Sequence, residues 1–182
     1  METSGIVLEP RLLVPKEVER INGLCLKFCG AKGSKLRDRD ALLSACGRTM
    51  ASAGGTWAHG TVAQQGLAIL DGIISSHPFV DGNKRTALVA LDLYLGDVGL
   101  RWRLPDTEKF DLIVALARGE RKGDRLPGEV IKIKTRPPDI SDRCKEIEFY
   151  VNLNENLLIF LDEHDRSWNG RWQPSGCVRS TT

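Results

Sequence analysis

The side chains best suited to chemistry gather in one short run, which reads His-Pro-Phe-Val-Asp-Gly-Asn-Lys-Arg-Thr-Ala-Leu from residue 77 to residue 88. His77 has an ordinary pKa of about 6.5, so its neutral imidazole can take a proton from an attacking hydroxyl group. Asp81 supplies a hard carboxylate oxygen of the kind that Mg²⁺ prefers when the ion also holds phosphates. We therefore interpret the run as a phosphate-handling site.

The second half of the run has the features of an anion site. Gly82 and Asn83 begin a helix, where unpaired backbone N–H groups and the helix dipole favour a bound anion. Lys84 and Arg85 place two cations at this same end, which is unfavourable without a ligand and becomes favourable once phosphates bind. Phe79 is expected to turn inward and anchor the loop. Each feature alone is common in ordinary turns, but their combination within nine consecutive positions favours a functional site.

Two apolar-faced helices are expected to hold this run in place. Thr61 can cap a helix that continues to Ser76, and a second helix follows Gly82 and loses its pattern near Gly96. Only six residues, 77–82, separate the two helices. They should therefore pack against each other in antiparallel orientation.

Three further helices are predicted in the first 120 residues. One spans residues 15–30, a short one spans 41–46 with Asp38 or Asp40 as its N-cap, and one spans 106–119. No segment up to this point has the pattern of a convincing strand. The sequence therefore predicts an all-α core.

The composition changes after residue 119, where Gly, Pro and charged residues become frequent. Residues 130–134 alternate apolar and basic side chains like a short strand. Residues 142–149 and 153–163 could each form a helix, although neither has a clear apolar stripe. Residues 167–182 show no periodicity and are predicted to be loose. This part of the chain suggests no function by itself.

The overall composition excludes several classes of protein. The 182 residues carry 26 Lys and Arg against 24 Asp and Glu, so the net charge of +2 gives no reason to expect binding to nucleic acid. The longest apolar run, residues 112–117, has six residues, far below the roughly 18 to 20 that a membrane span requires. The first residues lack the pattern of a signal peptide, and the five cysteines form no CxxC pair. We expect a cytoplasmic protein without membrane association, whose thiols are reduced.

The run from His77 to Leu88 resembles the HxFx(D/E)GNxR signature of the Fic/Doc (Fido) superfamily. It is most similar to the death-on-curing (Doc) branch, in which Lys follows the Asn and Thr-Ala follows the Arg. The similarity extends from about Leu12 to Gly119, and it implies an all-α, Fido-type helical bundle whose central antiparallel helix pair carries the loop. By this resemblance the chain divides into two parts, a Fic/Doc (Fido) domain and a partly disordered C-terminal extension, with the bounds 1–120 and 121–182.

The resemblance also implies a role for each residue of the run. His77 is the catalytic general base toward a protein hydroxyl, Asp81 is the Mg²⁺ ligand, and Phe79 is the structural anchor of the loop. The nucleotide and its phosphates are held by the four residues that follow, namely Gly82, Asn83, Lys84 and Arg85. ATP and Mg²⁺ are therefore the expected cofactors.

Two positions depart from the pattern of the AMP-transferring members of the family. Lys84 stands where those members have Gly, and Leu88 stands where they have a second Arg. In the Doc branch this change goes with a reversed nucleotide, so that the γ-phosphate of Mg-ATP is transferred to a hydroxyl side chain. The resemblance therefore implies a Doc-like, toxin-type protein phosphotransferase. Fic-type AMP transfer to a protein hydroxyl is the first alternative, and a non-catalytic Fido-fold interaction module is the second.

The family also suggests partners. By resemblance, the target protein is a translation factor. The missing second Arg removes the usual partner of the family's inhibitory glutamate, which favours control by a separate antitoxin-like inhibitor protein. Residues 54–60, with Trp57 and His59, form either a hairpin flap that docks the target by strand addition or a flexible loop with one packed Trp. Neither His59 nor His164 has the neighbours that a metal site or a triad requires.

Overall fold

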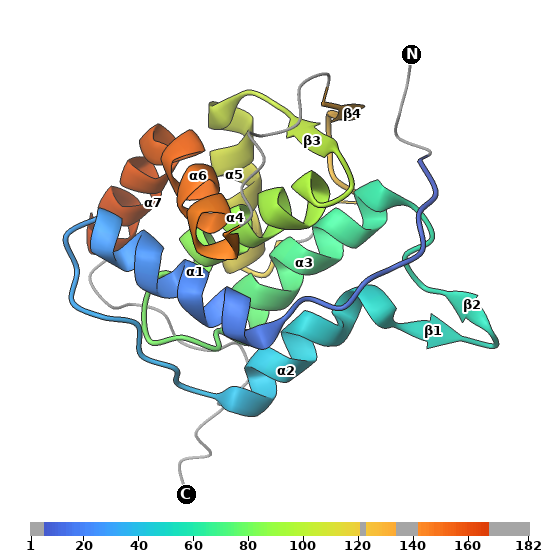
Figure 1. Ribbon diagram of the computed structural model, residues 1–182, viewed down its shortest axis with the longest axis horizontal. Helices are drawn as coiled ribbons and strands as arrows, with labels where there is room; N and C mark the ends of the chain where they lie inside the picture. Colours follow the sequence, from blue (N-terminus) through green and yellow to red (C-terminus); the bar gives the residue numbers. More distant parts are fainter. Residues whose placement is uncertain (1–5, 121–122, 134–141, 168–182) are drawn as a thin grey trace, which may run out of the picture.

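The computed structural model describes residues 6–120, 123–133 and 142–167, which form a mainly helical molecule (Figure 1). The helices of these residues are α1 (Pro15–Phe28), α2 (Arg39–Gly47), the 3₁₀ helix η1 (Arg48–Met50), α3 (Val62–Ser76), α4 (Asn83–Gly96), α5 (Asp106–Ala117), α6 (Arg143–Leu153) and α7 (Glu155–Ser167). The strands are β1 (Ser52–Ala53), β2 (Thr56–Trp57), β3 (Leu100–Arg103) and β4 (Glu129–Lys132). The all-α architecture predicted from the sequence is confirmed.

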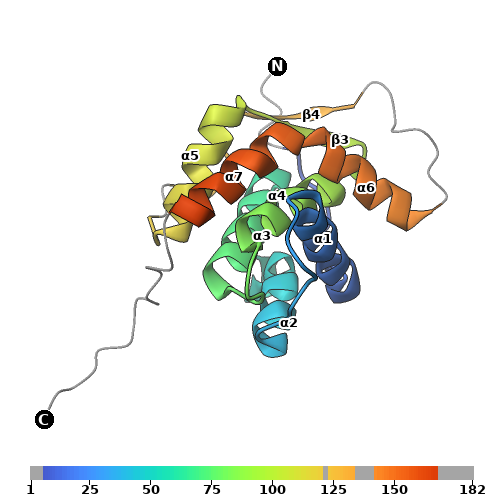
Figure 2. The same cartoon turned by 90° about the vertical axis from the view of Figure 1, so that its left-hand side faces the viewer.

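Helix α4 is the centre of the bundle. Each of its residues is buried, which is the property of a helix surrounded by other elements on all sides. Figure 2 shows α1, α2 and α3 on one side of α4, and α5, α6 and α7 with the β3–β4 ribbon on the other. Helix α3 packs beside α4 and runs in the opposite direction, so the expected central helix pair is present (Figure 1).

The start of α3 is fixed by a capping box. The Thr61 hydroxyl accepts a hydrogen bond from the Gln64 amide at 3.3 Å, and the Gln64 side chain accepts one from the Thr61 amide at 3.1 Å. The two bonds satisfy backbone donors that a helix start leaves unpaired. Thr61 therefore caps α3 as predicted.

The expectation of no strand before residue 119 is wrong. Strand β3 pairs antiparallel with β4, with Leu100 opposite Lys132 and Trp102 opposite Val130. Strand β3 is only four residues long, and Leu100 and Trp102 face the core while Arg101 and Arg103 are exposed. Such a short alternation is easily overlooked beside the helical periodicity of α4. The strand expected at 130–134 is confirmed as β4.

Helices α6 and α7 belong to the same hydrophobic core as the first five helices. Ile147, Leu158 and Leu161 are fully buried in the cluster that also contains Leu88 of α4. These helices start near the expected positions, although their sequences have no clear apolar stripe. Of the segment expected to be loose, only Ser167 lies within the described residues, at the end of α7.

Four of the five cysteines lie within the described residues, and Cys177 lies outside them. Cys25, Cys29, Cys46 and Cys144 are free thiols, and Cys25 and Cys46 are buried. Within residues 6–120, 123–133 and 142–167, no cluster of His, Cys, Asp or Glu has the arrangement of a metal site. No helix in these ranges is long and apolar enough to cross a membrane.

Candidate active site

The loop between α3 and α4 is bounded by two residues with left-handed backbone. His77 ends α3 with φ 47°, and Gly82 precedes α4 with φ 77°. A Cβ atom at Gly82 would lie 3.0 Å from Asn22 Nδ2 and 3.2 Å from Leu26 Cδ2. Gly82 is therefore required both by its conformation and by the close packing of α1 against the loop.

The Asn83 side chain stabilises the loop through hydrogen bonds to the backbone of Phe79. Its Nδ2 donates a hydrogen bond to the Phe79 carbonyl at 2.8 Å, and its Oδ1 accepts one from the Phe79 amide at 3.0 Å. The Phe79 side chain is fully buried, and its backbone forms a β-bridge with Leu36. Phe79 thus turns inward as expected. The structure also shows that Asn83 contributes to this anchoring through its side chain.

His77 is neutral at physiological pH. Burial lowers the pKa of His77, and the charges of Arg37 and Lys84 lower it further, to about 4. Asn83 Nδ2 lies 3.3 Å from His77 Nδ1. Because an amide NH₂ group donates, this contact suits the tautomer in which Nδ1 accepts and Nε2 carries the proton. The lone pair on Nδ1 is then the one that neutral His77 offers to a proton.

Asp81 lies at the exposed edge of the loop. Its Oδ1 accepts hydrogen bonds from the Gly82 amide and from Arg85 Nη2, the latter at 2.8 Å. Its Oδ2 accepts no hydrogen bond from the described residues, and half of the side chain is exposed. Mg²⁺ is often held by one or two carboxylates together with substrate phosphates. Asp81 therefore fits the role of a magnesium ligand.

A buried amide holds this part of the loop, and the sequence did not single it out. Asn22 of α1 donates to the Asp81 carbonyl at 2.8 Å and to Thr86 Oγ1 at 3.0 Å. Ser34 Oγ donates to Asn22 Oδ1 at 2.7 Å. The signal available in the sequence was a polar residue next to Ile21 on the apolar face of α1.

The two cations at the start of α4 are already paired with carboxylates of α7. Arg85 is fully buried, with Nη1 2.8 Å from Asp162 Oδ1. Lys84 Nζ contacts Asp165 Oδ1, and Asp162 also pairs with Arg166 at 2.7 Å. Two cations at this helix end were expected to be unfavourable without a ligand, and the carboxylates of α7, which folds back over the start of α4, offset that cost.

The hollow beside these ion pairs is small and mainly acidic. Its volume is about 360 Å³, and its lining includes Asp81, Asp162 and Asp165 together with Arg166. Buried Arg85 Nε and Nη1 have no hydrogen-bond partner among the described residues, although Nη1 lies 2.8 Å from the Asp162 carboxylate. Phosphates that approach Lys84 and Arg85 must compete with Asp162 and Asp165.

The hairpin expected as a docking flap lies away from this site. Strands β1 and β2 precede α3, whereas His77 follows it, so the helix of 15 residues, about 22 Å long, separates them (Figure 1). The segment that borders the loop is instead 35–37, where the Arg37 amide donates to the Pro78 carbonyl at 2.8 Å and the Val80 amide to the Lys35 carbonyl at 3.0 Å. Trp57 and His59 are thus not placed beside His77.

The fold and the loop define a helical protein in which a neutral histidine and two cations meet at a helix N-terminus. A family model described as the Fic/DOC family matches residues 13–95 of the chain. The match includes every residue that the sequence placed in the site, and it supports the Fido superfamily, whose members generally are protein-modifying transferases. Helices α6 and α7 lie outside the matched range. No curated protein matches the chain.

Proposed function

We propose that this protein is a Doc-like transferase that moves the γ-phosphate of Mg-ATP to a hydroxyl side chain of a target protein. The proposal rests on one observation: around the N-terminus of α4, the structure brings together His77, Asp81, Lys84 and Arg85. A proton acceptor, a carboxylate and an anion-binding helix start are the components that phosphoryl transfer to a hydroxyl requires.

Each residue has a role that its surroundings support. His77 is neutral, so it accepts the proton of a Ser, Thr or Tyr hydroxyl as that oxygen attacks. The backbone N–H groups at the start of α4, with Lys84 and Arg85, bind the phosphates and offset their charge. Asp81 would hold Mg²⁺, which when bound neutralises further negative charge on the phosphates.

The choice of γ-phosphate over AMP rests on two positions. Lys84 presents a long cationic side chain at the helix start, where AMP-transferring relatives have Gly. Leu88 is fully buried in the hydrophobic core, so its side chain supplies no second cation to the site. Both differences support the Doc-like reaction, and AMP transfer remains the alternative that the experiment below distinguishes.

The buried ion pairs favour a second candidate function. Arg85 is fully buried and paired with Asp162, an arrangement that a non-catalytic Fido-fold interaction module could retain. In either case the proposed partners are a target protein, by family resemblance a translation factor, and an antitoxin-like inhibitor protein.

The test is labelling of proteins in a cell extract with ATP that carries the label in either the α- or the γ-phosphate. We expect label from the γ position only, and a mass increase of about 80 Da on the target, against about 329 Da for AMP. His77→Ala should abolish the labelling. His59→Ala, at the other end of α3, should leave it unchanged. Label from the α position would show AMP transfer, and labelling that survives His77→Ala would contradict catalysis at this loop.

A further inference from the structure

A large hollow lies at the surface between α5 and α7, two helices that contact each other and lie side by side in Figure 2. Its volume is about 690 Å³. None of its described lining residues belongs to the hollow beside Lys84 and Arg85, so the two sites are separate. The lining residues that matter here are Asp106, Phe110 and Asp111 of α5 and Phe160, Glu163 and His164 of α7.

The apolar part of this hollow is aromatic. The Phe160 side chain is 57% exposed. Phe110 is partly buried, and its ring meets the His164 ring edge-on with the two centroids 5.6 Å apart. An aromatic side chain exposed beside a hollow of this size differs from a scattered surface residue, because an apolar side chain of a partner can bury it.

The rim of the hollow is acidic on both sides, with Asp106 and Asp111 on α5 and Glu163 on α7. The side chains of Asp111 and Glu163 form no ion pair or hydrogen bond with the described residues, and Asp106 has only a loose ion pair with Lys109 at 3.8 Å. No Lys or Arg is found among the described residues that line the hollow. The rim therefore attracts cations and disfavours nucleic acid and anionic membranes.

Helix α7 carries this acidic, aromatic surface on the side that faces away from α4. Asp162 and Asp165 face α4, where they pair with the two cations of the candidate active site. Each residue turns an α-helix by about 100°, so Phe160, Glu163 and Ser167 lie on the opposite side from these two aspartates. The ion pairs of the candidate active site therefore leave the charge of the hollow unopposed.

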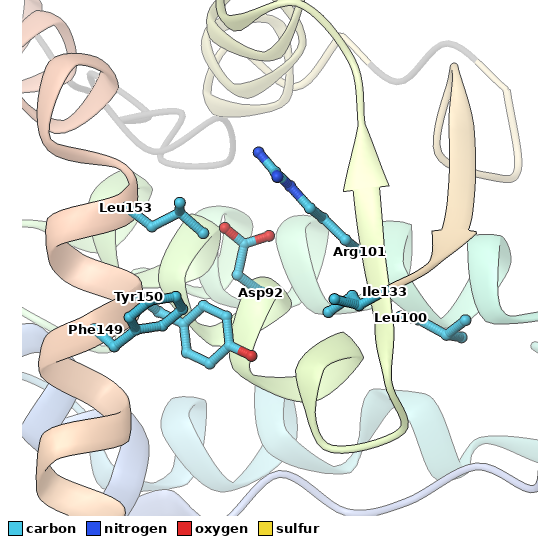
Figure 3. Close-up of a pocket in the computed structure, with 7 residues that line it drawn as sticks. All are labelled: Asp92, Leu100, Arg101, Ile133, Phe149, Tyr150 and Leu153. Carbon is cyan, nitrogen blue, oxygen red and sulfur yellow. The ribbon is translucent and has the colours of Figure 1, made fainter. Parts of the chain in front are cut away.

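A smaller hollow, between α6 and the β3–β4 ribbon, lacks such a charge imbalance (Figure 3). Its volume is about 180 Å³, and the carboxylate in its lining is the buried Asp92. Asn154 donates a hydrogen bond to Asp92 at 2.7 Å, and the positive charges of Lys109 and Arg101 act on the same carboxylate. This smaller hollow does not specify the charge of a ligand, whereas the one between α5 and α7 does.

We propose that the hollow between α5 and α7 binds an amphipathic helix of a partner protein, with Lys or Arg on both sides of an apolar stripe. An apolar side chain of that helix packs against Phe110 and Phe160, and its flanking cations pair with Asp111 on one side and Glu163 on the other. The lining of α7 extends from Phe160 to Ser167, about 10 Å, which two turns of a docked helix cover.

Three synthetic peptides of equal length test the proposal on the full chain. The first has Leu at helical spacing and Lys at the remaining positions, the second has Glu in place of Lys, and the third keeps Lys but has Ser in place of Leu. Binding is measured by titration with NMR detection of the backbone amides. We expect saturable shifts in residues 106–111 and 160–167 with the first peptide only. Binding of the second or the third peptide with equal affinity would overturn the proposal.

A pair of variants on α7 tests the aromatic anchor. Phe160→Ser should weaken binding of the first peptide by roughly tenfold or more, because the central apolar contact is lost. Ile159→Ser is the control, since Ile159 is also exposed on α7, at 44%, but is not among the described lining residues. It should leave the affinity unchanged, and equal effects of the two substitutions would overturn the proposal.

Charge reversals test the rim. Asp111→Lys and Glu163→Lys should each weaken binding several-fold, with a smaller effect at high salt because salt screens exposed charges. Glu148→Lys, at an exposed position of α6, changes the net charge equally and should have little effect. Unchanged affinity in both rim variants would overturn the proposal. Shifts of residues 106–111 and 160–167 that depend on protein concentration without peptide would also overturn it, because they would assign the hollow to a second copy of the chain.

Discussion

His77 remains neutral because its surroundings oppose a positive charge. Burial is the main cause, Arg37 and Lys84 contribute through their own charges, and together they lower the pKa from 6.5 to about 4. Between these two pH values an unfolded chain binds a proton at this residue that the folded chain does not. The unfolded state therefore gains stability relative to the folded state as the pH falls through this window. Acidification from pH 6.5 to pH 4 should thus lower the free energy of unfolding, and His77→Gln should reduce that loss.

The contribution of Lys84 to this pKa can be measured directly. Replacing Lys84 with Met removes a nearby positive charge, so the pKa of His77 should rise from about 4 toward its ordinary value. An NMR titration of the imidazole resonances gives the pKa of each histidine, and the chain has only three. Lys27→Met, at an exposed position of α1, is the control and should leave the His77 pKa unchanged. An unchanged pKa in Lys84→Met as well would show that this charge does not reach the imidazole.

Asn22 is the side chain that ties α1 to the loop. Asn22→Ala removes donors from the Asp81 carbonyl and from Thr86 Oγ1 and leaves these buried acceptors unpaired. We expect a loss of about 1–3 kcal/mol in the free energy of unfolding, measured by urea denaturation. Asn152→Ala, at an exposed position of α6, should change it by less than about 0.5 kcal/mol. Equal effects of the two substitutions would contradict the role given to Asn22.

At the scale of elements, α7 controls the charge of the candidate active site. Asp165→Asn removes the carboxylate that pairs with Lys84 and competes with phosphate for it. The dissociation constant for Mg-ATP should therefore be lower than that of the unmodified chain by roughly tenfold or more. Glu163→Gln, on the exposed side of the same helix, makes the same change in charge away from Lys84 and should have little effect. Calorimetric titration compares the two. If both variants bind Mg-ATP like the unmodified chain, competition between Asp165 and phosphate does not occur.

The sequence predicted the elements whose signals are local. The Thr61 cap and the apolar face of α3 lie within one segment, and the run from His77 to Arg85 is itself contiguous, so the loop and its helix pair could be expected in advance. The carboxylate partners of Lys84 and Arg85 could not. Asp165 is 81 residues from Lys84 in the chain, and only the packing of α7 brings the two together.

The remaining errors also have physical reasons. Strand β3 has four residues, too few for its alternation to stand out from the helix before it. The β1–β2 hairpin was recognisable from Gly54 and Gly55, both with positive φ, but its position was not. The sequence indicates a turn after η1. It does not show that α3 places this turn and His77 at opposite ends of the bundle.

At the scale of the whole molecule, α6 and α7 complete the core around α4. Ile147, Leu158 and Leu161 are fully buried, and α7 supplies the partners of Lys84 and Arg85. A chain that ends at residue 120 would expose the apolar surface that these side chains cover and leave Arg85 without Asp162. Loss of several buried large side chains at roughly 1.5–3 kcal/mol each is comparable with the roughly 5–15 kcal/mol free energy of unfolding of a typical domain. We therefore expect residues 1–120 alone to lack a cooperative thermal transition by circular dichroism.

A second truncation provides the matched control. A chain that ends after Ser167 keeps every described helix, so it should unfold cooperatively with a midpoint close to that of the full chain. The comparison separates loss of α6 and α7 from loss of the last 15 residues. A cooperative transition of residues 1–120 at the same midpoint would instead show that the first five helices fold independently, with the C-terminal part as an accessory extension.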